Sequence, residues 1–292
     1  MTPITIANAL ASTVTLNDGT VMPMFGLGVY RIDNNCSDLI AAALQQGYLL
    51  IDTAEFYNNE HSVGVAIKQS GKKREEVFVI SKWWPSTEGA KGAMKSLDQC
   101  LKNLESNYVD LYMIHAPKDH HCADAYQALL DAKKQGKIKS LGVANFGVHH
   151  LEALAKLGLE KPSVNQIQIH PWYQNNDIVR YCREHNITVI GYSPLAKAKK
   201  IDETTIVAIA KKLSKSPAQI LIRWSVQHGY VTIPKTSQEG RLKTNADVFT
   251  WSIPDEDMKT LDALGDQQWS CTWDPTKYSL EEAGLQVITI QQ

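Results

Sequence analysis

The chain has 292 residues, of which 43% are hydrophobic and 21% are charged, and its formal net charge is −1 at pH 7. A charge this close to zero gives no electrostatic basis for binding nucleic acid or an anionic membrane surface. No apolar run approaches the roughly 20 residues needed to span a bilayer, and the N-terminus lacks a basic stretch before a compact apolar core, so we expect neither a membrane span nor a signal peptide.

The first predicted element is a β-hairpin over residues 13–23. Its sequence, TVTLNDGTVMP, has two alternating runs on either side of Asn17, Asp18 and Gly19. Asn, Asp and Gly are the residues that tight hairpin turns favour, so the pattern predicts two short antiparallel strands.

Apolar, β-rich segments then alternate with helical patterns. The predicted strands cover residues 25–30, 49–54, 77–83, 109–116, 140–146, 163–170, 187–195 and 231–236. Helical spacing of apolar residues appears at 37–47, 60–71, 93–106, 123–136, 149–158 and 177–186. Several of these helices are expected to stop at a glycine, as at Gly47, Gly71 and Gly136. A last helix from about residue 252 precedes an irregular tail, 265–280, whose two tryptophans predict that it packs on the body.

Eight strands followed by helices are typical of βαβ units and a parallel sheet. The count favours a closed (β/α)8 TIM barrel, with residues 1–292 forming a single domain and the hairpin closing the bottom of the barrel. Active sites of such barrels lie at the carboxyl ends of the strands, so polar residues at those ends are the candidates for function.

Five cysteines, an odd number without a C-x-x-C pair, are expected to be reduced thiols in a cytoplasmic protein. His120, His121 and Cys122 stand together, but no second group of ligands with zinc-like spacing accompanies them. We therefore expect no metal site.

Polar side chains stand at the ends of three adjacent predicted strands. Asp52 ends the second strand and Tyr57 follows it, Lys82 ends the third, and His115 ends the fourth. Taken singly, Asp52 could equally be a helix N-cap and Tyr57 an ordinary packing residue. Neighbouring strand ends meet at the mouth of a barrel, so the four side chains are expected to lie together.

A lysine held between apolar walls needs a counter-charge, and Asp52 is the natural partner of Lys82. We expect this pair to leave positive charge beside Tyr57 and to lower its pKa from about 10. A tyrosine tuned in this way can act as a general acid, while His115 donates a hydrogen bond to a carbonyl oxygen or shares the proton transfer. The set favours reduction of a carbonyl by an external hydride donor.

The ordered segments GYLLIDTAEFYNNEHSVG, VDLYMIHAP, SLGVANF, VNQIQIHPW, GYSPLA and IPKTSQEGRLKTN extend over nearly the whole chain. With them the chain resembles the aldo-keto reductases. The resemblance implies a catalytic tetrad of Asp52, Tyr57, Lys82 and His115. It also implies NADPH/NADP+ as cofactor, with NADH weaker, bound across the barrel mouth without a G-x-G-x-x-G fingerprint. The implied cofactor contacts are Gly28, Val29, Asn145, Gln166, Tyr192, Ser193, Leu195, Lys235, Thr236, Ser237, Arg241 and Asn245.

By this resemblance, Asn145 and Gln166 would meet the nicotinamide carboxamide, and Tyr192 would stack on the ring. Ser193 and Leu195 would line the pyrophosphate. The adenosine end would be held by a further group, in which Asn245 contacts adenine and the 2′-phosphate lies among Lys235, Thr236, Ser237 and Arg241. Two cations with hydroxyls suit a phosphate dianion.

The chain departs from the family pattern in several places, among them Leu49, which stands where arginine is usual. Ala144 replaces the usual serine and Thr244 replaces a frequent glutamate, which weakens the expected grip on the cofactor. Ala116 stands where many members carry tryptophan, so the substrate pocket is expected to be wider, with Tyr30 and Trp84 as its remaining aromatic walls. Short segments after the fourth and seventh strands predict an open site.

The sequence thus predicts an NADPH-dependent reductase of aldehydes and ketones, including aldoses, sugar-derived dicarbonyls, uronate aldehydes and aromatic aldehydes. One alternative is a Schiff-base aldolase using Lys82, although Asp52 would keep that amine charged. The other is a non-enzymatic binding role, as in channel-associated subunits of the same fold. A small-molecule carbonyl is the expected partner, and a cytoplasmic monomer is the expected state.

Overall fold

The sheet in the computed structural model of the chain, which describes residues 4–32 and 36–286, contains eight parallel strands. They are β3 (Leu27–Gly28), β4 (Leu50–Asp52), β5 (Phe78–Trp83), β6 (Val109–Ile114), β7 (Ile138–Ala144), β8 (Val164–Gln168), β9 (Thr188–Tyr192) and β10 (Val231–Thr232), paired in that order. Parallel bridges from Phe25 to Thr232 and from Gly28 to Lys235 join the first strand to the last. The sheet therefore closes on itself, which confirms the predicted (β/α)8 barrel.

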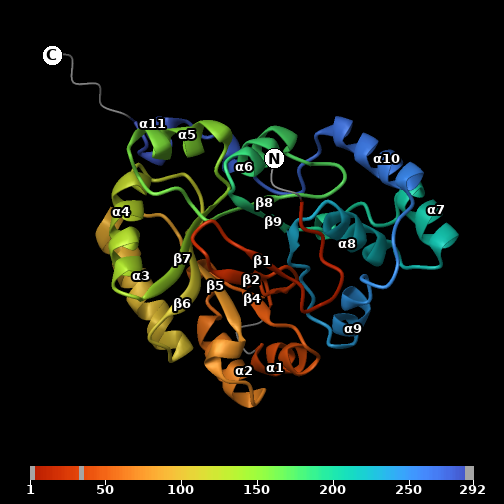
Figure 1. Cartoon of the computed structure of the whole chain (residues 1–292), viewed down its shortest axis with the longest axis horizontal. Helices are drawn as coiled ribbons and strands as arrows, with labels where there is room; N and C mark the ends of the chain where they lie inside the picture. Colours follow the sequence, from red (N-terminus) through yellow and green to blue (C-terminus); the bar gives the residue numbers. More distant parts are fainter. Residues whose placement is uncertain (1–3, 33–35, 287–292) are drawn as a thin grey trace.

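Helices surround the barrel (Figure 1). Those in the described part of the chain are α1 (Ser37–Gln45), α2 (Glu60–Gln69), α3 (Gly89–Leu104), α4 (Cys122–Lys134), α5 (Val148–Lys156), α6 (Asn176–Glu184), α7 (Thr204–Leu213), α8 (Pro217–Gln227), α9 (Gly240–Ala246), α10 (Asp255–Ala263) and α11 (Leu280–Ala283). Short 3-10 turns are η1 (Glu55–Tyr57), η2 (Arg74–Glu76), η3 (Ala196–Ala198), η4 (Leu264–Gln267) and η5 (Pro275–Lys277). The predicted helix stops at Gly47, Gly71 and Gly136 are confirmed, since each has a positive φ, of 96°, 75° and 78°. Two helices, α7 and α8, lie between β9 and β10, beyond the helices expected from the sequence.

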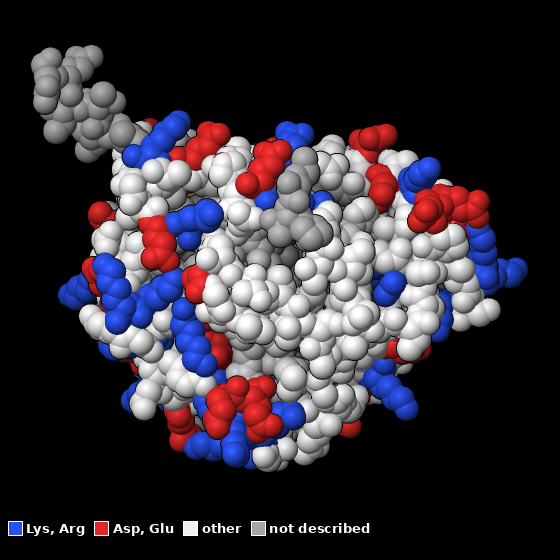
Figure 2. Space-filling view, in the orientation of Figure 1, with Lys and Arg blue, Asp and Glu red and all other residues white. Residues whose placement is uncertain are grey.

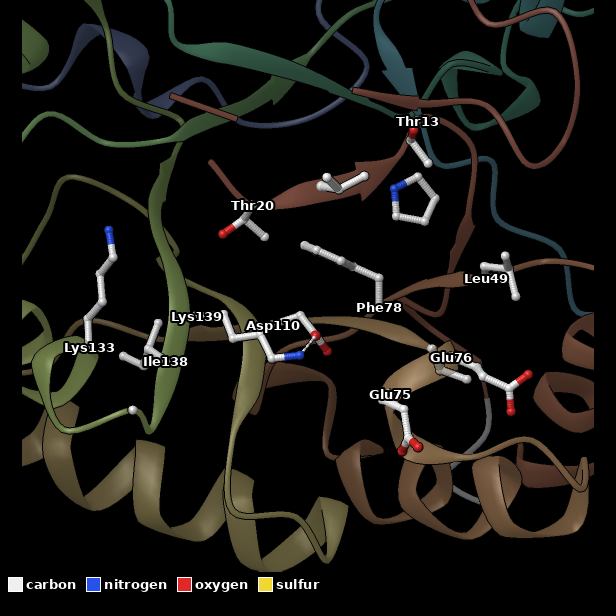
Figure 3. A pocket seen from close by; sticks show the side chains of 14 residues that line it. Thr13, Thr20, Leu49, Glu75, Glu76, Phe78, Asp110, Lys133, Ile138 and Lys139 are labelled. Atoms are coloured by element: carbon white, nitrogen blue, oxygen red, sulfur yellow. Dashed lines mark hydrogen bonds and ion pairs between the residues drawn. The ribbon is translucent and has the colours of Figure 1, made fainter. Parts of the chain in front are cut away.

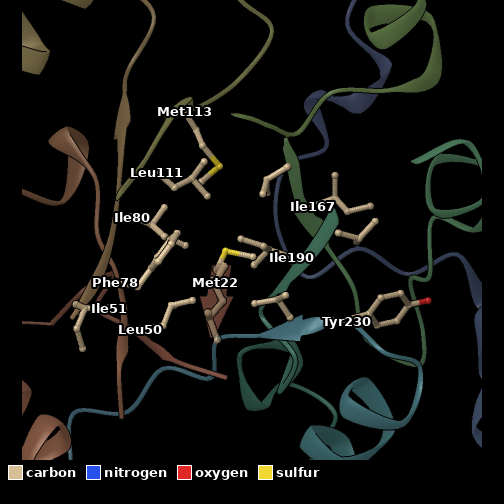
Figure 4. Close-up of a cluster of buried hydrophobic side chains, with 14 of the residues drawn as sticks. Met22, Leu50, Ile51, Phe78, Ile80, Leu111, Met113, Ile167, Ile190 and Tyr230 are labelled. Carbon is tan, nitrogen blue, oxygen red and sulfur yellow. The ribbon is translucent and has the colours of Figure 1, made fainter. Parts of the chain in front are cut away.

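The hairpin of β1 (Thr13–Thr15) and β2 (Val21–Pro23) covers the amino-terminal end of the barrel. At its turn, the Asn17 side chain donates to the carbonyls of Pro162 and Asn186, at 3.0 Å each. These two residues precede β8 and β9, so the turn is tied to the entrance of the strands. Figure 4 shows Met22 of β2 among buried side chains such as Leu50 and Ile190 inside the barrel. The predicted plug at the bottom of the barrel is therefore confirmed.

Asp18 anchors the turn of this hairpin. Its carboxylate accepts hydrogen bonds from the hydroxyls of Ser140 and Ser163, at 2.7 and 2.8 Å, and pairs with Lys133 at 3.1 Å. Burial opposes ionisation, but these contacts and the Thr20 N–H lower the pKa of Asp18 from 3.8 to about 2. Because the folded-state pKa lies below the unfolded one, this carboxylate stabilises the fold above the unfolded pKa, and the contribution is lost as the pH falls toward about 2.

Asp18→Asn is expected to lower the free energy of unfolding at neutral pH by about 1–2 kcal/mol, a range that allows for solvent screening. The difference from the wild type should shrink as the pH falls toward about 2. Urea denaturation at pH 7 and at about pH 2 measures this difference. Asp98→Asn is the control, since the Asp98 side chain is exposed and, among the described residues, pairs only with Lys137. An equal loss at both pH values would contradict the role of the Asp18 charge.

A cavity of about 660 Å³ opens at the same end of the barrel, between the hairpin and the starts of β5 and β7 (Figure 3). Its lining includes Leu49 and Phe78, and the ion pair of Lys139 with Asp110 at 3.0 Å. It lies at the end of the barrel opposite the strand ends where catalytic residues are found. Positively charged lysine and arginine side chains and negatively charged aspartate and glutamate side chains are interspersed around the rim of this face (Figure 2). No helix in the described ranges is long and apolar enough to cross a membrane.

The carboxyl-terminal tail packs on the barrel, as predicted. Trp269 donates its backbone N–H to the carbonyl of Trp172 at 2.9 Å, and their rings meet edge to face. The N–H of Cys271 donates to the side chain of Gln168, on β8, at 2.9 Å. The tail thus reaches the carboxyl ends of the strands.

Candidate active site

A cavity of about 430 Å³ lies at the carboxyl ends of the barrel strands. Its lining comprises Gly28, Tyr30, Arg31, Asp52, Phe56, Tyr57, Trp84, His115, Gln166, Tyr192, Ser193, Pro194, Leu195, Lys197, Ala198, Ile233, Lys235, Thr236, Ser237, Arg241, Thr272 and Trp273. Most of the site residues predicted from the sequence are among them. The exceptions are Lys82, Val29, Asn145, Asn245 and Ala116.

Lys82 and Asp52 form a buried ion pair beside the cavity. The Lys82 Nζ donates to both carboxylate oxygens of Asp52, at 2.9 and 2.8 Å, and to the carbonyl of Thr53 at 2.8 Å. The lysine side chain is fully buried. Burial lowers the pKa of Lys82, while the charge and hydrogen bonds of Asp52 act in the opposite direction. The predicted pairing is confirmed, and its charges largely cancel inside the protein.

The loop that carries Tyr57 is fixed from two sides. In one direction, the Thr53 hydroxyl donates to Asn59 at 2.6 Å, and the Asn59 amide donates to the carbonyl of Val29 at 2.9 Å. In the other, the N–H of Trp84 donates to the Glu55 carboxylate at 2.9 Å. These bonds tie η1 to the ends of β3 and β5, so the tyrosine is held over the ion pair.

Tyr57 lies next to the buried pair, with its hydroxyl 3.5 Å from the Lys82 Nζ. Burial, followed by the charge of Asp52, raises the pKa of Tyr57 well above 10. The expectation that Lys82 would lower this pKa is wrong, because Asp52 neutralises the lysine at closer range than the phenol. Tyr57 therefore stays protonated at neutral pH.

His115 follows β6 and lines the cavity opposite Tyr57. Its ring meets the rings of Tyr57 and Trp84 edge to face, with centroids 5.6 and 5.0 Å apart. Its Nδ1 is buried without a hydrogen-bond partner among the described residues. Burial and the charges of Lys82 and Lys118 hold the pKa of His115 well below 6.5. The imidazole is therefore neutral at neutral pH.

These two pKa directions predict a flat pH profile. With the Tyr57 pKa raised and the His115 pKa lowered, neither group changes protonation between about pH 6.5 and about pH 9. The turnover number for carbonyl reduction at saturating cofactor is expected to vary less than about twofold across this range. Steady-state rates in constant-ionic-strength buffers measure it. An apparent pKa within the range would contradict a protonated Tyr57 and a neutral His115.

Amide side chains connect the pair to the rest of the site. The Gln166 amide lines the cavity and donates to Asp52 at 2.7 Å. Asn145 does not line the cavity, because its amide donates to the carbonyl of His115 and its oxygen accepts from the Tyr192 hydroxyl, at 2.9 Å each. Asn145 thus holds Tyr192 and the end of β6 in place, and its contact with a carboxamide stays a prediction.

Two cations stand together at the other end of the cavity. Lys235 and Arg241 are exposed, and neither forms an ion pair with a carboxylate in the part of the chain that is described. Burial, followed by the charge of Arg241, lowers the pKa of Lys235. Thr236 and Ser237 line the same end. Two cations beside hydroxyls suit a phosphate dianion, so these residues fit the adenosine phosphate of NADP(H).

Two predicted cofactor residues lie outside the lining. Val29 is fully buried, and its N–H and carbonyl are used by Asp52 and Asn59. Asn245, on α9, is also buried. Their predicted contacts with a cofactor would need a change in this arrangement.

Aromatic rings form the outer wall of the cavity. The ring of Phe56 stacks on that of Trp84, with centroids 4.5 Å apart. The ring of Trp273, from the tail, has its centroid 5.7 Å from that of Trp84. Phe56 and Trp273 are 49% and 39% exposed. Ala116 is fully buried and is not among the residues that line the cavity, and its place at the substrate pocket stays a prediction.

Sequence reasoning missed Phe56, Trp273, Arg31 and Lys197, all of which line the cavity. Phe56 stands next to Tyr57, and that position was the available signal. For Trp273 the sequence signal was weaker. A tryptophan in an irregular tail predicted that the tail packs on the barrel, but not that this residue lies at the cavity.

Comparison with known proteins matches residues 32–266 to the Aldo/keto reductase family. The Glyoxal reductase of Bacillus subtilis (strain 168) is 42% identical over 258 residues, which cover 88% of this chain and 94% of that protein. The 9,11-endoperoxide prostaglandin H2 reductase of Trypanosoma cruzi (strain CL Brener) is 37% identical, with 89% and 94% covered. Among solved structures, an aldo-keto reductase from a Medee basin deep-sea metagenome library superposes with a TM-score of 0.86 at 37% identity, covering 91% of this chain and 99% of that one. A Bombyx mori aldo-keto reductase in complex with NADP has a TM-score of 0.83 at 28% identity, with 90% and 95% covered.

Proposed function

The chain belongs to the aldo/keto reductase family, and we propose that it reduces aldehydes and ketones, small dicarbonyls above all, with NADPH and with Tyr57 as the proton donor. Membership makes it an NAD(P)H-dependent oxidoreductase acting on carbonyl compounds, with NADP(H) as cofactor. The observation that carries the proposal is that Tyr57 and His115 face one cavity beside the buried Lys82–Asp52 pair.

When bound, NADPH supplies the hydride that reduces the carbonyl carbon. As negative charge develops on the substrate oxygen, the Tyr57 hydroxyl donates its proton to that oxygen. The neutral imidazole of His115 donates a hydrogen bond to the same oxygen and so orients the carbonyl. The Lys82 Nζ, held by Asp52, lies 3.5 Å from the Tyr57 oxygen and donates a hydrogen bond to the phenolate as it forms. This contact offsets only part of the rise in the Tyr57 pKa that burial and Asp52 cause.

The Bacillus subtilis relative is a glyoxal reductase, and this supports small dicarbonyl aldehydes, including sugar-derived ones, as the first substrates to test. The aromatic wall of Phe56, Trp84 and Trp273 supports aromatic aldehydes as a second class. Aldoses and uronate aldehydes complete the panel.

NADPH oxidation, followed by its absorbance against this panel with NADH in parallel, tests the function. We expect turnover with NADPH and the highest kcat/KM for a dicarbonyl. If no carbonyl supported NADPH oxidation by protein that binds the cofactor, the reductase function would be excluded.

Removal of the two cations at the adenosine end should change the affinity for NADPH much more than the affinity for NADH. Lys235→Ala with Arg241→Ala removes two charge-assisted contacts and is expected to weaken NADPH binding about 100-fold or more, while NADH binding changes little. Fluorescence titration measures both affinities. Lys243→Ala on α9 is the matched control, since that lysine is exposed but does not line the cavity. Equal losses for NADPH and NADH would contradict a 2′-phosphate contact.

A Schiff-base aldolase is the second candidate, and the contacts of Lys82 speak against it. The side chain is fully buried, and its amine is occupied by Asp52 and the Thr53 carbonyl. A carbonyl carbon reaching Nζ would have to displace these partners. Borohydride treatment with substrate should leave Lys82 unmodified in a mass spectrum.

We also propose that residues 1–292 act as one domain, in a cytoplasmic monomer. No disulfide joins any of the five cysteines, which is compatible with a reducing compartment. Size-exclusion chromatography with light scattering gives the mass in solution.

A further inference from the structure

A buried carboxylate outside the cavity has no cation paired with it. Glu60 is the first residue of α2 and is 5% exposed. Its two oxygens accept from the Ser81 hydroxyl at 2.5 Å and from the Asn103 amide at 3.0 Å. Within residues 4–32 and 36–286, no lysine, arginine or histidine forms an ion pair with it. A carboxylate buried among neutral partners costs free energy unless its charge stabilises another group.

Three elements hold this carboxylate in one place. Ser81 lies on β5, Asn103 lies on α3, and Glu60 itself begins the helix that follows the turn of Tyr57. The helices α2 and α3 lie side by side outside the barrel (Figure 1). The amino-terminal end of α2 and the two donated hydrogen bonds favour the ionised form of the carboxyl group. Glu60 is therefore a fixed negative charge between β5 and these two helices.

This charge lies behind the strand that carries Lys82. Ser81 and Lys82 are neighbours on β5, and successive side chains of a strand point to opposite faces. Lys82 therefore faces Asp52, while Ser81 faces Glu60. Burial lowers the pKa of Lys82, whereas the charge and hydrogen bonds of Asp52 and the charge of Glu60 raise it. Two carboxylates, one on each face of the strand, thus act on one ammonium group.

The other titratable groups around this carboxylate are neutral, exposed or paired elsewhere. The Cys100 thiol of α3 faces it, and burial, followed by the charge of the carboxylate, raises the pKa of Cys100 well above 9. Burial likewise raises the pKa of Tyr112, on β6, well above 10. Arg74, whose charge reaches Cys100, pairs with Asp110 at 2.8 Å. His61, the next residue of α2, is exposed. The carboxylate therefore acts on the buried ammonium group of β5 rather than on a thiolate or a phenolate.

We propose that Glu60 is a positioning residue of the reductase, a second carboxylate that keeps Lys82 charged while the phenolate forms on Tyr57. The inference rests on the proposed function, since it concerns the same proton transfer. Asp52 is shared, because it also accepts from the Gln166 amide at 2.7 Å. When Tyr57 gives its proton to the carbonyl oxygen, the phenolate competes for a proton of Lys82. Negative charge behind β5 opposes that loss, so the Nζ stays an ammonium group that donates to the phenolate.

Glu60→Gln tests the charge, because glutamine keeps the length of the side chain and an oxygen that accepts from Ser81. Turnover with NADPH and a small dicarbonyl is measured from about pH 7 to about pH 10.5. Near neutral pH we expect a turnover number within about threefold of the wild type, with unchanged KM and NADPH affinity. The fall at alkaline pH should begin earlier, so that the ratio of turnover at about pH 10 to turnover at about pH 7 drops roughly threefold or more below the wild-type ratio.

NMR measures the ionisation of Lys82 without cofactor or substrate. Protein that carries lysine labelled with carbon-13 at Cε reports the titration of each amine, and a variant with Lys82→Met and Asp52→Asn identifies the Lys82 signal by its loss. In Glu60→Gln this signal should titrate at a lower pH than in the wild type. Glu60→Asp keeps the charge, so its Lys82 titration and its alkaline profile should stay close to those of the wild type, whatever stability it loses.

Asp110→Asn is the matched control. Asp110 is also a buried carboxylate, but it pairs with Arg74 and Lys139 at the start of β6. This variant should be less stable than the wild type, with the alkaline profile and the Lys82 titration both unchanged.

An unchanged alkaline profile and an unchanged Lys82 titration in Glu60→Gln would overturn the inference while leaving the reductase function intact. A loss of turnover that is equal at every pH would also overturn it, because Glu60 would then be a purely structural residue. Absence of carbonyl reduction by the wild type would reject the proposed function and the role in proton transfer with it. The NMR titration separates that result from a failure of Glu60 to act on Lys82.

Discussion

Replacing Tyr57 by phenylalanine is expected to lower the turnover number by roughly 100- to 10,000-fold, the usual contribution of a positioned general acid. The ring contacts with Tyr30 and His115 remain, and the hydroxyl makes only a long contact of 3.5 Å with Lys82. Fold and NADPH affinity should therefore stay close to those of the wild type. Stopped-flow single turnovers with bound NADPH separate the chemical step from cofactor binding.

Tyr30→Phe is the matched control, since Tyr30 lines the same cavity and its ring contacts Tyr57, but among the described residues its hydroxyl has no hydrogen bond to Lys82 or Asp52. Its turnover number should fall less than about tenfold. If Tyr57→Phe kept wild-type turnover, another group would be the proton donor, and His115 would be the next residue to test.

Replacing Lys82 by methionine has the second large expected effect, on stability as well as on activity. The variant leaves the Asp52 carboxylate buried without its counter-charge, which costs about 3–5 kcal/mol. Turnover should fall at least as far as in the tyrosine variant, because the phenolate loses its stabilising charge. Urea denaturation, with heat denaturation as a check, measures the loss of stability.

A double variant keeps this prediction falsifiable. Lys82→Met combined with Asp52→Asn removes both charges and leaves an amide that can still bond to Gln166. Most of the lost stability should return, while activity should not. If the single Lys82→Met variant were as stable as the wild type, the pair would not carry the buried charge assigned to it.

The strand ends of the site were predictable because barrel topology does not depend on side-chain detail. Asp52, Lys82 and His115 follow three adjacent apolar strands, and parallel strands of a barrel end at one rim. The pairing of Lys82 with Asp52 followed from the cost of burying a lone charge. For these residues, local sequence pattern and global fold agree.

The pKa of Tyr57 was predicted in the wrong direction because it depends on distances that sequence does not contain. Burial of the phenol raises its pKa most, and the charge of Asp52 adds to this. Asp52 lies 2.8 Å from the Lys82 Nζ, whereas the tyrosine hydroxyl lies 3.5 Å from it, so the carboxylate compensates most of the lysine's charge. The place of Trp273 depends in the same way on how the tail folds back across the barrel mouth.

Hydride transfer from NADPH to a carbonyl carbon can be followed directly with an isotope label. NADPH deuterated at its transferable position, first on one face of the nicotinamide and then on the other, would be turned over with a small dicarbonyl, and the alcohol analysed by NMR. Hydride transfer is expected to place deuterium on the former carbonyl carbon from one face only, because the ring of Tyr192 lines the site where the nicotinamide would stack. An alcohol without deuterium from either face, or no alcohol at all, would contradict it.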